Sequence, residues 1–181
     1  VVASADILPL FREFERTSTA VANAYVQPIV SRYLSKLENR LKGQGYSGDL
    51  LIMQSNGGMM SVEAARDFSV NTVLSGPAAG VIAATRIAAE SGAHNLIAYD
   101  MGGTSLDVSV VSDGKPMVSN GIEPEFGIPI MVSMIDIHTI GAGGGSVARI
   151  DPGGLLQVGP DSAGAEPGPV CYGLGGTEPT V

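Results

Sequence analysis

Apolar residues recur along the chain with two different spacings, one typical of helices and one of strands. From Thr17 onward they recur at steps of three and four, which predicts a long amphipathic helix that ends at Gly43. Pro28 lies inside this pattern and is expected to kink or divide the helix, because proline has no N–H to donate. A short helix is predicted over residues 10–16, and residues 1–8 fit either a strand or a loop.

Short apolar runs bounded by glycine, proline and polar residues predict strands in the rest of the chain. The predicted strands span residues 50–53, 96–99, 106–111, 116–119, 128–137, 146–150 and 155–158. Between the first two of these runs, a helix of small residues is expected from about Pro77 to Glu90, with Ala and Gly along one face. From Gly141 to the end, 12 of 41 residues are Gly, a density that predicts loops and short strands rather than helices.

The composition indicates a globular protein. Of 181 residues 44% are hydrophobic and 15% are charged, and the net charge of −8 argues against a nucleic-acid-binding surface. A single cysteine, Cys171, cannot form an internal disulfide, and no apolar run is long enough to predict a membrane span. We therefore expect a cytoplasmic protein. Because the chain opens with Val-Val and ends within a loop, we expect it to be a segment of a longer protein.

The hairpin around Asp100-Met-Gly-Gly-Thr104 carries the strongest chemical signal. Glycines 102 and 103 let the turn bring N–H groups against a phosphate, and Thr104 adds a hydroxyl donor. Asp100, at the end of a strand, could hold a hydrated Mg²⁺ beside the phosphate oxygens. An ordinary hairpin with a glycine turn explains the same five residues equally well.

Two further groups of residues allow a functional and a structural interpretation. Asn56, Gly57 and Gly58 follow a strand where ligands bind in α/β folds, but they also suit a plain turn before a helix that begins at Ser61. Asp136 and His138, two positions apart on a strand, would share one face. They could ligate a metal or transfer protons, or form a hydrogen-bonded pair that fixes the loop.

Taken in order, these motifs give the chain a resemblance to a known family. The pattern comprises Gln-Ser-Asn-Gly-Gly (54–58), Ser-Gly-Pro-Ala-Ala-Gly (75–80), Asp-Met-Gly-Gly-Thr (100–104), Asp-Ile-His-Thr-Ile-Gly-Ala-Gly-Gly-Gly-Ser (136–146), Gly-Pro-Asp-Ser-Ala-Gly-Ala-Glu-Pro-Gly-Pro (159–169) and Cys-Tyr-Gly (171–173). It resembles the hydantoinase A / 5-oxoprolinase family, which belongs to the actin, sugar-kinase and heat-shock-chaperone ATPase superfamily and includes acetone carboxylase subunits.

The resemblance implies an α/β fold, namely an actin-like (ribonuclease H-like) ATPase lobe with a mixed sheet, flanking helices and a glycine-rich C-terminal part. Residues 1–92 would form the helical tail of one lobe with the small-residue crossover helix. Residues 93–181 would begin the second lobe. Family members are several times longer, and their first phosphate hairpin would lie upstream of this chain.

The resemblance also implies a function: ATP- and Mg²⁺-dependent opening of a cyclic amide, such as a hydantoin or 5-oxoproline, through phosphorylation of the carbonyl oxygen. A hydantoinase B-like subunit or domain would be the partner, and a second divalent metal would fit the same scheme. A subunit of an ATP-dependent ketone carboxylase is one alternative, and a non-catalytic actin-like nucleotide-binding module is another. The 181 residues alone are expected to be inactive.

Residue roles follow from the same resemblance. Asp100 would serve Mg²⁺ through water, and Gly102, Gly103 and Thr104 would hold phosphate. Asp107 would orient Thr104 or a metal-bound water. The three glycines of the second glycine-rich turn would bind cofactor, Asp136 and His138 would be catalytic or metal ligands, and Asn56 to Gly58 would contact substrate. The glycines of that second turn are Gly143, Gly144 and Gly145.

Overall fold

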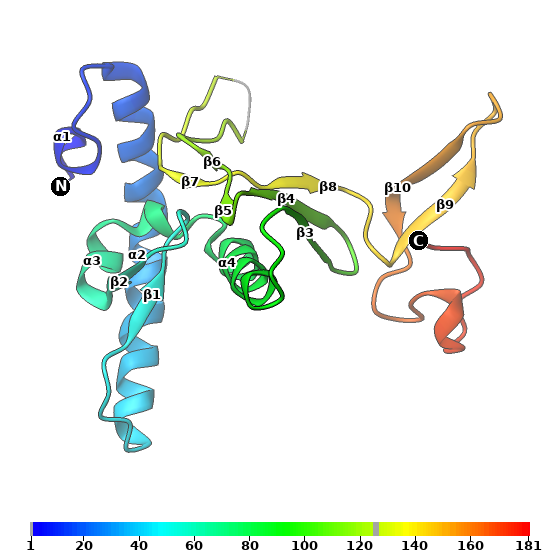
Figure 1. The fold of residues 1–181 in the computed structure, drawn as a ribbon, viewed down its shortest axis with the longest axis horizontal. Coiled ribbons are helices and arrows are strands. Elements are labelled where there is room, and N and C mark those ends of the chain that lie inside the picture. Colours follow the sequence, from blue (N-terminus) through cyan, green and yellow to red (C-terminus); the bar gives the residue numbers. More distant parts are fainter. Residues whose placement is uncertain (1, 125–126) are drawn as a thin grey trace. The chain divides into compact units, whose positions relative to one another are not determined.

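The computed structural model describes residues 2–124 and 127–181, and the chain divides into two compact units (Figure 1). Unit 1 consists of residues 1–83 with 116–136, and unit 2 of residues 84–115 with 137–181. These units differ from the predicted lobe segments 1–92 and 93–181, which concern a larger fold and stay a prediction.

Unit 1 is built on one long helix, α2 (Glu13–Gly43) (Figure 1). This single element contains both predicted N-terminal helices, and it continues through Pro28, so the chain is not divided there. A proline removes one backbone hydrogen bond, and contacts along the buried side of α2 outweigh that local loss. Before α2, the short helix α1 (Ser4–Ile7) replaces the predicted strand or loop.

Buried polar side chains attach α2 to the rest of unit 1. Asn23 is fully buried; its Nδ2 donates to the Asp67 carbonyl at 2.9 Å, and its Oδ1 accepts from the Val70 N–H at 2.9 Å. Thr19 Oγ1 accepts from the Met131 N–H at 2.9 Å. Because each bond satisfies a backbone group far away in sequence, these two side chains fix where the later segments lie on the helix.

Apolar packing among the described residues of unit 1 includes the following two clusters. Leu34 of α2 packs with buried residues of β2 (Met59–Ser61) and α3 (Val62–Asp67). A second cluster lies around the 3₁₀ turn η1 (Ser69–Thr72). The buried members of the two clusters are Leu34, Met60, Val62 and Ala65, and Val70, Val132 and Met134.

The first predicted strand is confirmed as β1 (Leu51–Met53), but it pairs antiparallel with β2. Residues 54–58 therefore close a β-hairpin, and the expected strand-to-helix turn is wrong. The predicted helix start is confirmed, because Ser61 Oγ accepts from the Ala64 N–H at the start of α3.

The apolar run 128–137 forms less strand than predicted. Only β7 (Met134–Ile135) is regular, and it pairs with β6 (Val118–Ser119). In addition to this pairing, the Ile135 N–H donates a hydrogen bond to the Ser55 carbonyl in the β1–β2 hairpin, at 2.8 Å. The run is apolar because several of its residues are buried, and irregular backbone satisfies that requirement as well as a strand does.

Helix α4 (Ser75–Glu90) contains the predicted small-residue face and has Pro77 in its first turn, as expected. The boundary between the two units falls inside this helix, at residues 83 and 84. Among the described residues, no helix is both long enough and apolar enough to cross a bilayer.

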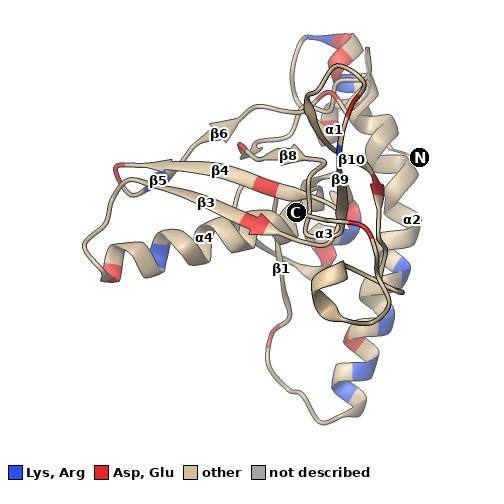
Figure 2. Ribbon diagram, turned by 90° about the vertical axis from the view of Figure 1, so that its right-hand side faces the viewer, with Lys and Arg blue, Asp and Glu red and all other residues tan. Residues whose placement is uncertain are grey.

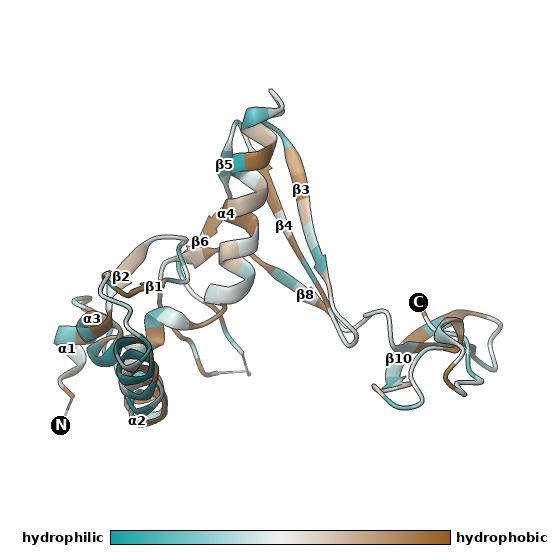
Figure 3. Ribbon diagram, turned by 90° about the horizontal axis from the view of Figure 1, so that it is seen from below, coloured by the Kyte–Doolittle hydropathy of each residue, from teal (hydrophilic) through white to brown (hydrophobic). Residues whose placement is uncertain are grey.

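In unit 2, β3 (Leu96–Met101) and β4 (Leu106–Ser112) form the predicted antiparallel hairpin. Strand β8 (His138–Ile140) pairs antiparallel with the first half of β4, and β5 (Lys115–Pro116) belongs to the same sheet. Hydrophobic positions recur along β3 (Figure 3), and two of its large side chains, Ile97 and Tyr99, are 68% and 74% exposed.

The C-terminal part of unit 2 contains the second predicted hairpin, β9 (Ser146–Ile150) with β10 (Leu156–Ser162), and the 3₁₀ turn η2 (Val170–Tyr172). Asp151 closes the β9–β10 turn, since its Oδ1 accepts from the N–H groups of Gly153 and Leu155. The Leu155 N–H is the main cause that lowers the pKa of Asp151 below its ordinary value.

Replacing Asn23 by Ala is expected to destabilise the protein by about 2–4 kcal/mol, because it leaves the buried Val70 N–H without a partner and removes the partly buried bond to the Asp67 carbonyl. Urea unfolding would measure the loss. Asn39→Ala, at an exposed position of the same helix, is the control and should change stability little. Equal effects of the two substitutions would contradict the assigned role of Asn23.

Candidate functional site

The turn between β3 and β4 contains the candidate phosphate motif. The Gly102 N–H donates to the Ser105 carbonyl at 2.9 Å, which closes a tight turn. Within the described part of the chain, the N–H groups of Gly103 and Thr104 donate no hydrogen bond. Both residues are exposed, and unbonded N–H groups in a glycine turn can bind an anion.

A second glycine-rich turn, residues 141–145, lies directly on the first. The Gly144 N–H donates to the Gly102 carbonyl at 2.9 Å, and the Gly145 N–H donates to the Gly103 carbonyl at 2.7 Å. A Cβ atom on Gly143 would lie only 2.5 Å from the Thr104 backbone nitrogen. The contact therefore requires glycine at position 143, because any side chain would push the two turns apart.

The N–H groups of the three glycines at 143–145 are engaged within the chain. The Gly143 N–H donates to Ser146 Oγ at 3.0 Å, and those of Gly144 and Gly145 bond the first turn. These three glycines thus shape the backbone around the phosphate motif, and their predicted contact with cofactor stays a prediction.

The two turns border a hollow of about 360 Å³. The segment 159–173 completes its wall with Gly164, Pro169 and Tyr172. The residues that line the hollow are Met101, Gly102, Gly103, Gly144, Gly145, Gly164, Pro169 and Tyr172. Three motifs that are separate in sequence thus meet in unit 2, and main-chain atoms form much of the lining.

Three polar side chains lie in a row across the sheet beside this turn. Asp100 of β3 is directly opposite Asp107 of β4, and Asp107 is opposite Thr139 of β8. Figure 2 shows the acidic positions of β3 and β4 on the two neighbouring strands. Thr139 Oγ1 donates to Asp107 Oδ1 at 2.6 Å. The predicted role of Asp107, which is to orient Thr104 or a metal-bound water, stays a prediction.

The acidic pair fits the requirements of Mg²⁺. This ion is commonly bound by one or two carboxylates together with water and substrate phosphate oxygens. Asp100 and Asp107 are opposite each other, and Asp100 is two residues before the phosphate turn. Among the described residues, no group of three or more His, Cys, Asp and Glu could hold a metal ion, so a site here would rest on this pair and the nucleotide.

The structure places the other predicted residues as follows. Asp136 ends the second segment of unit 1, and His138 begins β8 in unit 2. Asn56 lies in the β1–β2 turn of unit 1, where its Oδ1 accepts from the Gly58 N–H at 2.8 Å. The catalytic or metal role of Asp136 and His138, and the substrate role of Asn56 to Gly58, stay predictions.

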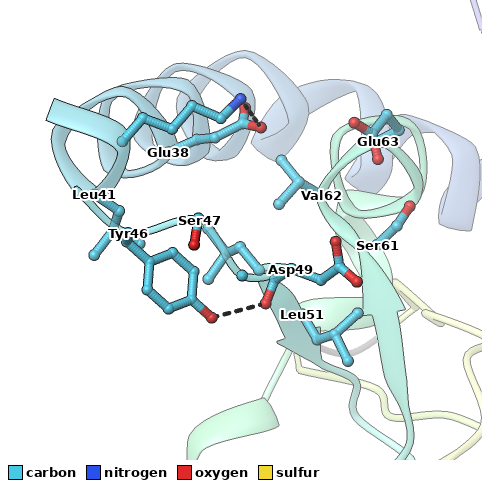
Figure 4. Close-up of a pocket in the computed structure, with 12 residues that line it drawn as sticks. Glu38, Leu41, Tyr46, Ser47, Asp49, Leu51, Ser61, Val62 and Glu63 are labelled. Carbon is cyan, nitrogen blue, oxygen red and sulfur yellow. Dashed lines mark hydrogen bonds and ion pairs between the residues drawn. The ribbon is translucent and has the colours of Figure 1, made fainter. Parts of the chain in front are cut away.

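A second hollow, of about 460 Å³, lies in unit 1 beside the C-terminal end of α2 (Figure 4). Glu38 at its edge pairs with Lys42 at 3.0 Å and with Arg66 at 2.9 Å. The hydrogen bond from Lys42, followed by that from Arg66, lowers the pKa of Glu38 below its ordinary value. Tyr46 Oη donates to the Asp49 carbonyl at 3.1 Å, so these interactions serve the local structure.

Comparison of the sequence with protein families finds one whose description is Hydantoinase/oxoprolinase, which matches residues 16–181. The α subunit of caprolactamase from Pseudomonas jessenii is 42% identical over 184 residues, covering 100% of this chain and 26% of that protein. The 5-oxoprolinase of Saccharomyces cerevisiae is 38% identical, covering 97% of this chain and 13% of that protein. The β subunit of acetone carboxylase from Xanthobacter autotrophicus is 34% identical, covering 98% and 24%.

Two solved structures have the same architecture. The ATP-dependent caprolactamase of Pseudomonas jessenii aligns with a TM-score of 0.80 at 43% identity, over 98% of this chain and 26% of that one. A nucleotide-free acetone carboxylase aligns with a TM-score of 0.75 at 33% identity, over 99% and 25%. The predicted α/β fold class, part of an actin-like ATPase, is thereby confirmed, and the chain spans about a quarter of these proteins.

Gly143→Ala is expected to separate the two glycine turns and to cost about 2 kcal/mol of stability, because the new methyl group would overlap backbone atoms of the first turn. Gly141→Ala is the control, since a Cβ there meets no atom within 4 Å. Hydrogen exchange of the Gly144 and Gly145 amides would report the separation directly. Unchanged protection in Gly143→Ala would contradict the close contact.

Proposed function

The chain belongs to the hydantoinase/oxoprolinase family, and from this premise we propose that it forms part of an enzyme that uses ATP to open a cyclic amide. The observation that carries the proposal is the backbone-lined hollow of unit 2, where both glycine turns meet next to the paired carboxylates. Such a hollow suits a nucleotide phosphate, because N–H groups neutralise its charge without bulky side chains.

The residues of unit 2 would divide the work of binding and orientation. Gly103 and Thr104 would donate backbone N–H groups to phosphate oxygens, and the Thr104 hydroxyl would add a third donor. Asp100 and Asp107 would hold Mg²⁺ through its water ligands. The ion would supply positive charge to the phosphate oxygens, while the protein would contribute mainly position and charge complementarity.

The proposed substrate class is based on the substrates for which two relatives are named. Caprolactamase and 5-oxoprolinase are named for substrates that contain a cyclic amide. An amide carbonyl is a poor electrophile; transfer of the γ-phosphoryl group to its oxygen would create a phosphate leaving group. ADP would leave as the phosphoryl group is transferred. Water could then add to the carbon, and the ring C–N bond would break with protonation of the nitrogen, leaving an acyl phosphate. A second water would hydrolyse this acyl phosphate to the carboxylate and inorganic phosphate.

A ketone carboxylase is the second candidate. It is supported by 34% identity to an acetone carboxylase β subunit and by the TM-score of 0.75 to a solved acetone carboxylase. Both candidates would use the same phosphate-binding hollow and would differ in the substrate that receives the phosphoryl group. A non-catalytic nucleotide-binding module is a weaker third candidate.

The expected partner and location are further parts of the proposal. The caprolactamase, acetophenone carboxylase and acetone carboxylase relatives are named as subunits, which supports a second, hydantoinase B-like subunit or domain here. We place the enzyme in the cytoplasm, where ATP is available. The 181 residues on their own would not turn over, because the chain spans about a quarter of these relatives and contains one phosphate hairpin.

In the full-length protein, Asp100→Asn is expected to lower ATP-coupled product release at least about 100-fold, because it removes a carboxylate charge that would hold Mg²⁺ beside the phosphate oxygens. The assay would follow phosphate and ring-opened product over caprolactam, 5-oxoproline, hydantoin and acetone. Asp113→Asn, in the turn at the far end of the same hairpin, is the matched control, since Asn tolerates the positive φ of 50° there. Full activity of Asp100→Asn would refute the assignment.

A further inference from the structure

We propose that Thr139 is a positioning residue for Asp107: its hydroxyl fixes the orientation of the Asp107 carboxylate, so that this carboxylate and Asp100 meet the nucleotide-bound divalent cation in one geometry. The inference rests on the proposed function of unit 2.

The hydrogen bond itself carries the first step. Thr139 Oγ1 lies 2.6 Å from Asp107 Oδ1, within the range of a hydroxyl that donates to a carboxylate. A threonine hydroxyl has a single hydrogen, and here that hydrogen is directed to Asp107. Because Thr139 is β-branched and sits in β8, its χ1 torsion has few alternatives, so the donor is well placed before any ligand binds.

Strand register gives the second step. Asp107 is the direct cross-strand neighbour of Thr139 on one side and of Asp100 on the other. Two carboxylates directly opposite each other repel, which favours rotation of one of them away from the pair. Thr139 lies on the side of Asp107 away from Asp100, so its bond holds the Asp107 carboxylate toward β8 and away from the like charge. The threonine thus selects one orientation of Asp107 before any cation binds.

The solvent exposure of Thr139 distinguishes a role in positioning Asp107 from a role in stabilising the fold. Thr139 and Asp100 are both exposed, and a hydrogen bond in contact with water contributes little to the free energy of folding. Loss of the Thr139 hydroxyl should therefore change the melting temperature only slightly. The larger effect should be on cation binding, because partners of metal-binding carboxylates commonly alter affinity 10- to 100-fold.

The position of Thr139 also connects the two glycine turns. Strand β8 ends at Ile140 and leads directly into the second turn, whose Gly144 and Gly145 bond the first turn. The bond between Thr139 and Asp107 is a third attachment of the same segment to the β3–β4 hairpin. Correct docking of the second turn and correct placement of Asp107 are therefore linked.

The test uses the full-length protein with three substitutions. Thr139→Val removes the hydroxyl and keeps the shape, Thr139→Ser keeps the hydroxyl, and Thr177→Val is a control at another exposed threonine of unit 2. Calorimetric titration of ADP at a series of Mg²⁺ concentrations would give the apparent Mg²⁺ affinity of each protein. Thermal melting without nucleotide would report stability.

Thr139→Val is expected to weaken the apparent Mg²⁺ affinity about 10-fold or more, with melting unchanged. Thr139→Ser should stay within about 3-fold of the wild type, as should Thr177→Val. The proposal is overturned if Thr139→Val keeps wild-type Mg²⁺ affinity while Asp100→Asn loses it. The proposal is also overturned if Thr139→Val and Thr139→Ser lower the Mg²⁺ affinity to the same extent and both lower the melting temperature, because the residue would then serve the fold.

Failure of the proposed function would look different. Wild-type protein would then bind ADP with no dependence on Mg²⁺, or would not bind it, whatever residue occupies position 139. That result would overturn the nucleotide assignment of unit 2 and this inference with it. A wild-type protein with Mg²⁺-dependent binding leaves Thr139 to be judged by its own variants.

Discussion

Contact between two stretches of backbone, with no side chain between them, determines the candidate site. Gly143 lies so close to the first turn that a single methyl group would overlap the Thr104 nitrogen. Two backbone hydrogen bonds, from Gly144 and Gly145, hold the turns in this arrangement. The hollow and the exposed N–H groups depend on this approach, because they lie at the two turns. The position of β8 is linked to it, because this strand leads directly into the second turn.

Local patterns in the sequence predicted the β3–β4 hairpin well. Apolar runs on both sides of two glycines predicted the two strands and the turn between them. They therefore placed Asp100 correctly near the end of a strand. The same reasoning failed for residues 128–137, where the residues are apolar because they are buried, and for the strand β2, which is only three residues long. Short elements that depend on tertiary partners leave little periodic signal.

Tertiary pairing also explains what sequence reasoning missed in the site. Nothing local indicates that Thr139 is opposite Asp107, because that depends on β8 joining the sheet beside β4. Nor does the position of Tyr172 follow from its neighbours, because the glycine density from Gly141 onward predicted only loops and short strands there. Motif order identified which segments matter, and the fold determined which atoms of those segments meet.

The register of β3 with β4 has a consequence for how such a protein could change over time. Asp100 and Asp107 share a face because the hairpin pairs them directly across a connection of fixed length. Side chains alternate between faces, so inserting one residue into β4 between the turn and Asp107 would move that carboxylate to the opposite surface. Substitutions that keep the length of β4 therefore leave the acidic pair in register, whereas an inserted residue there would abolish the pair in one step.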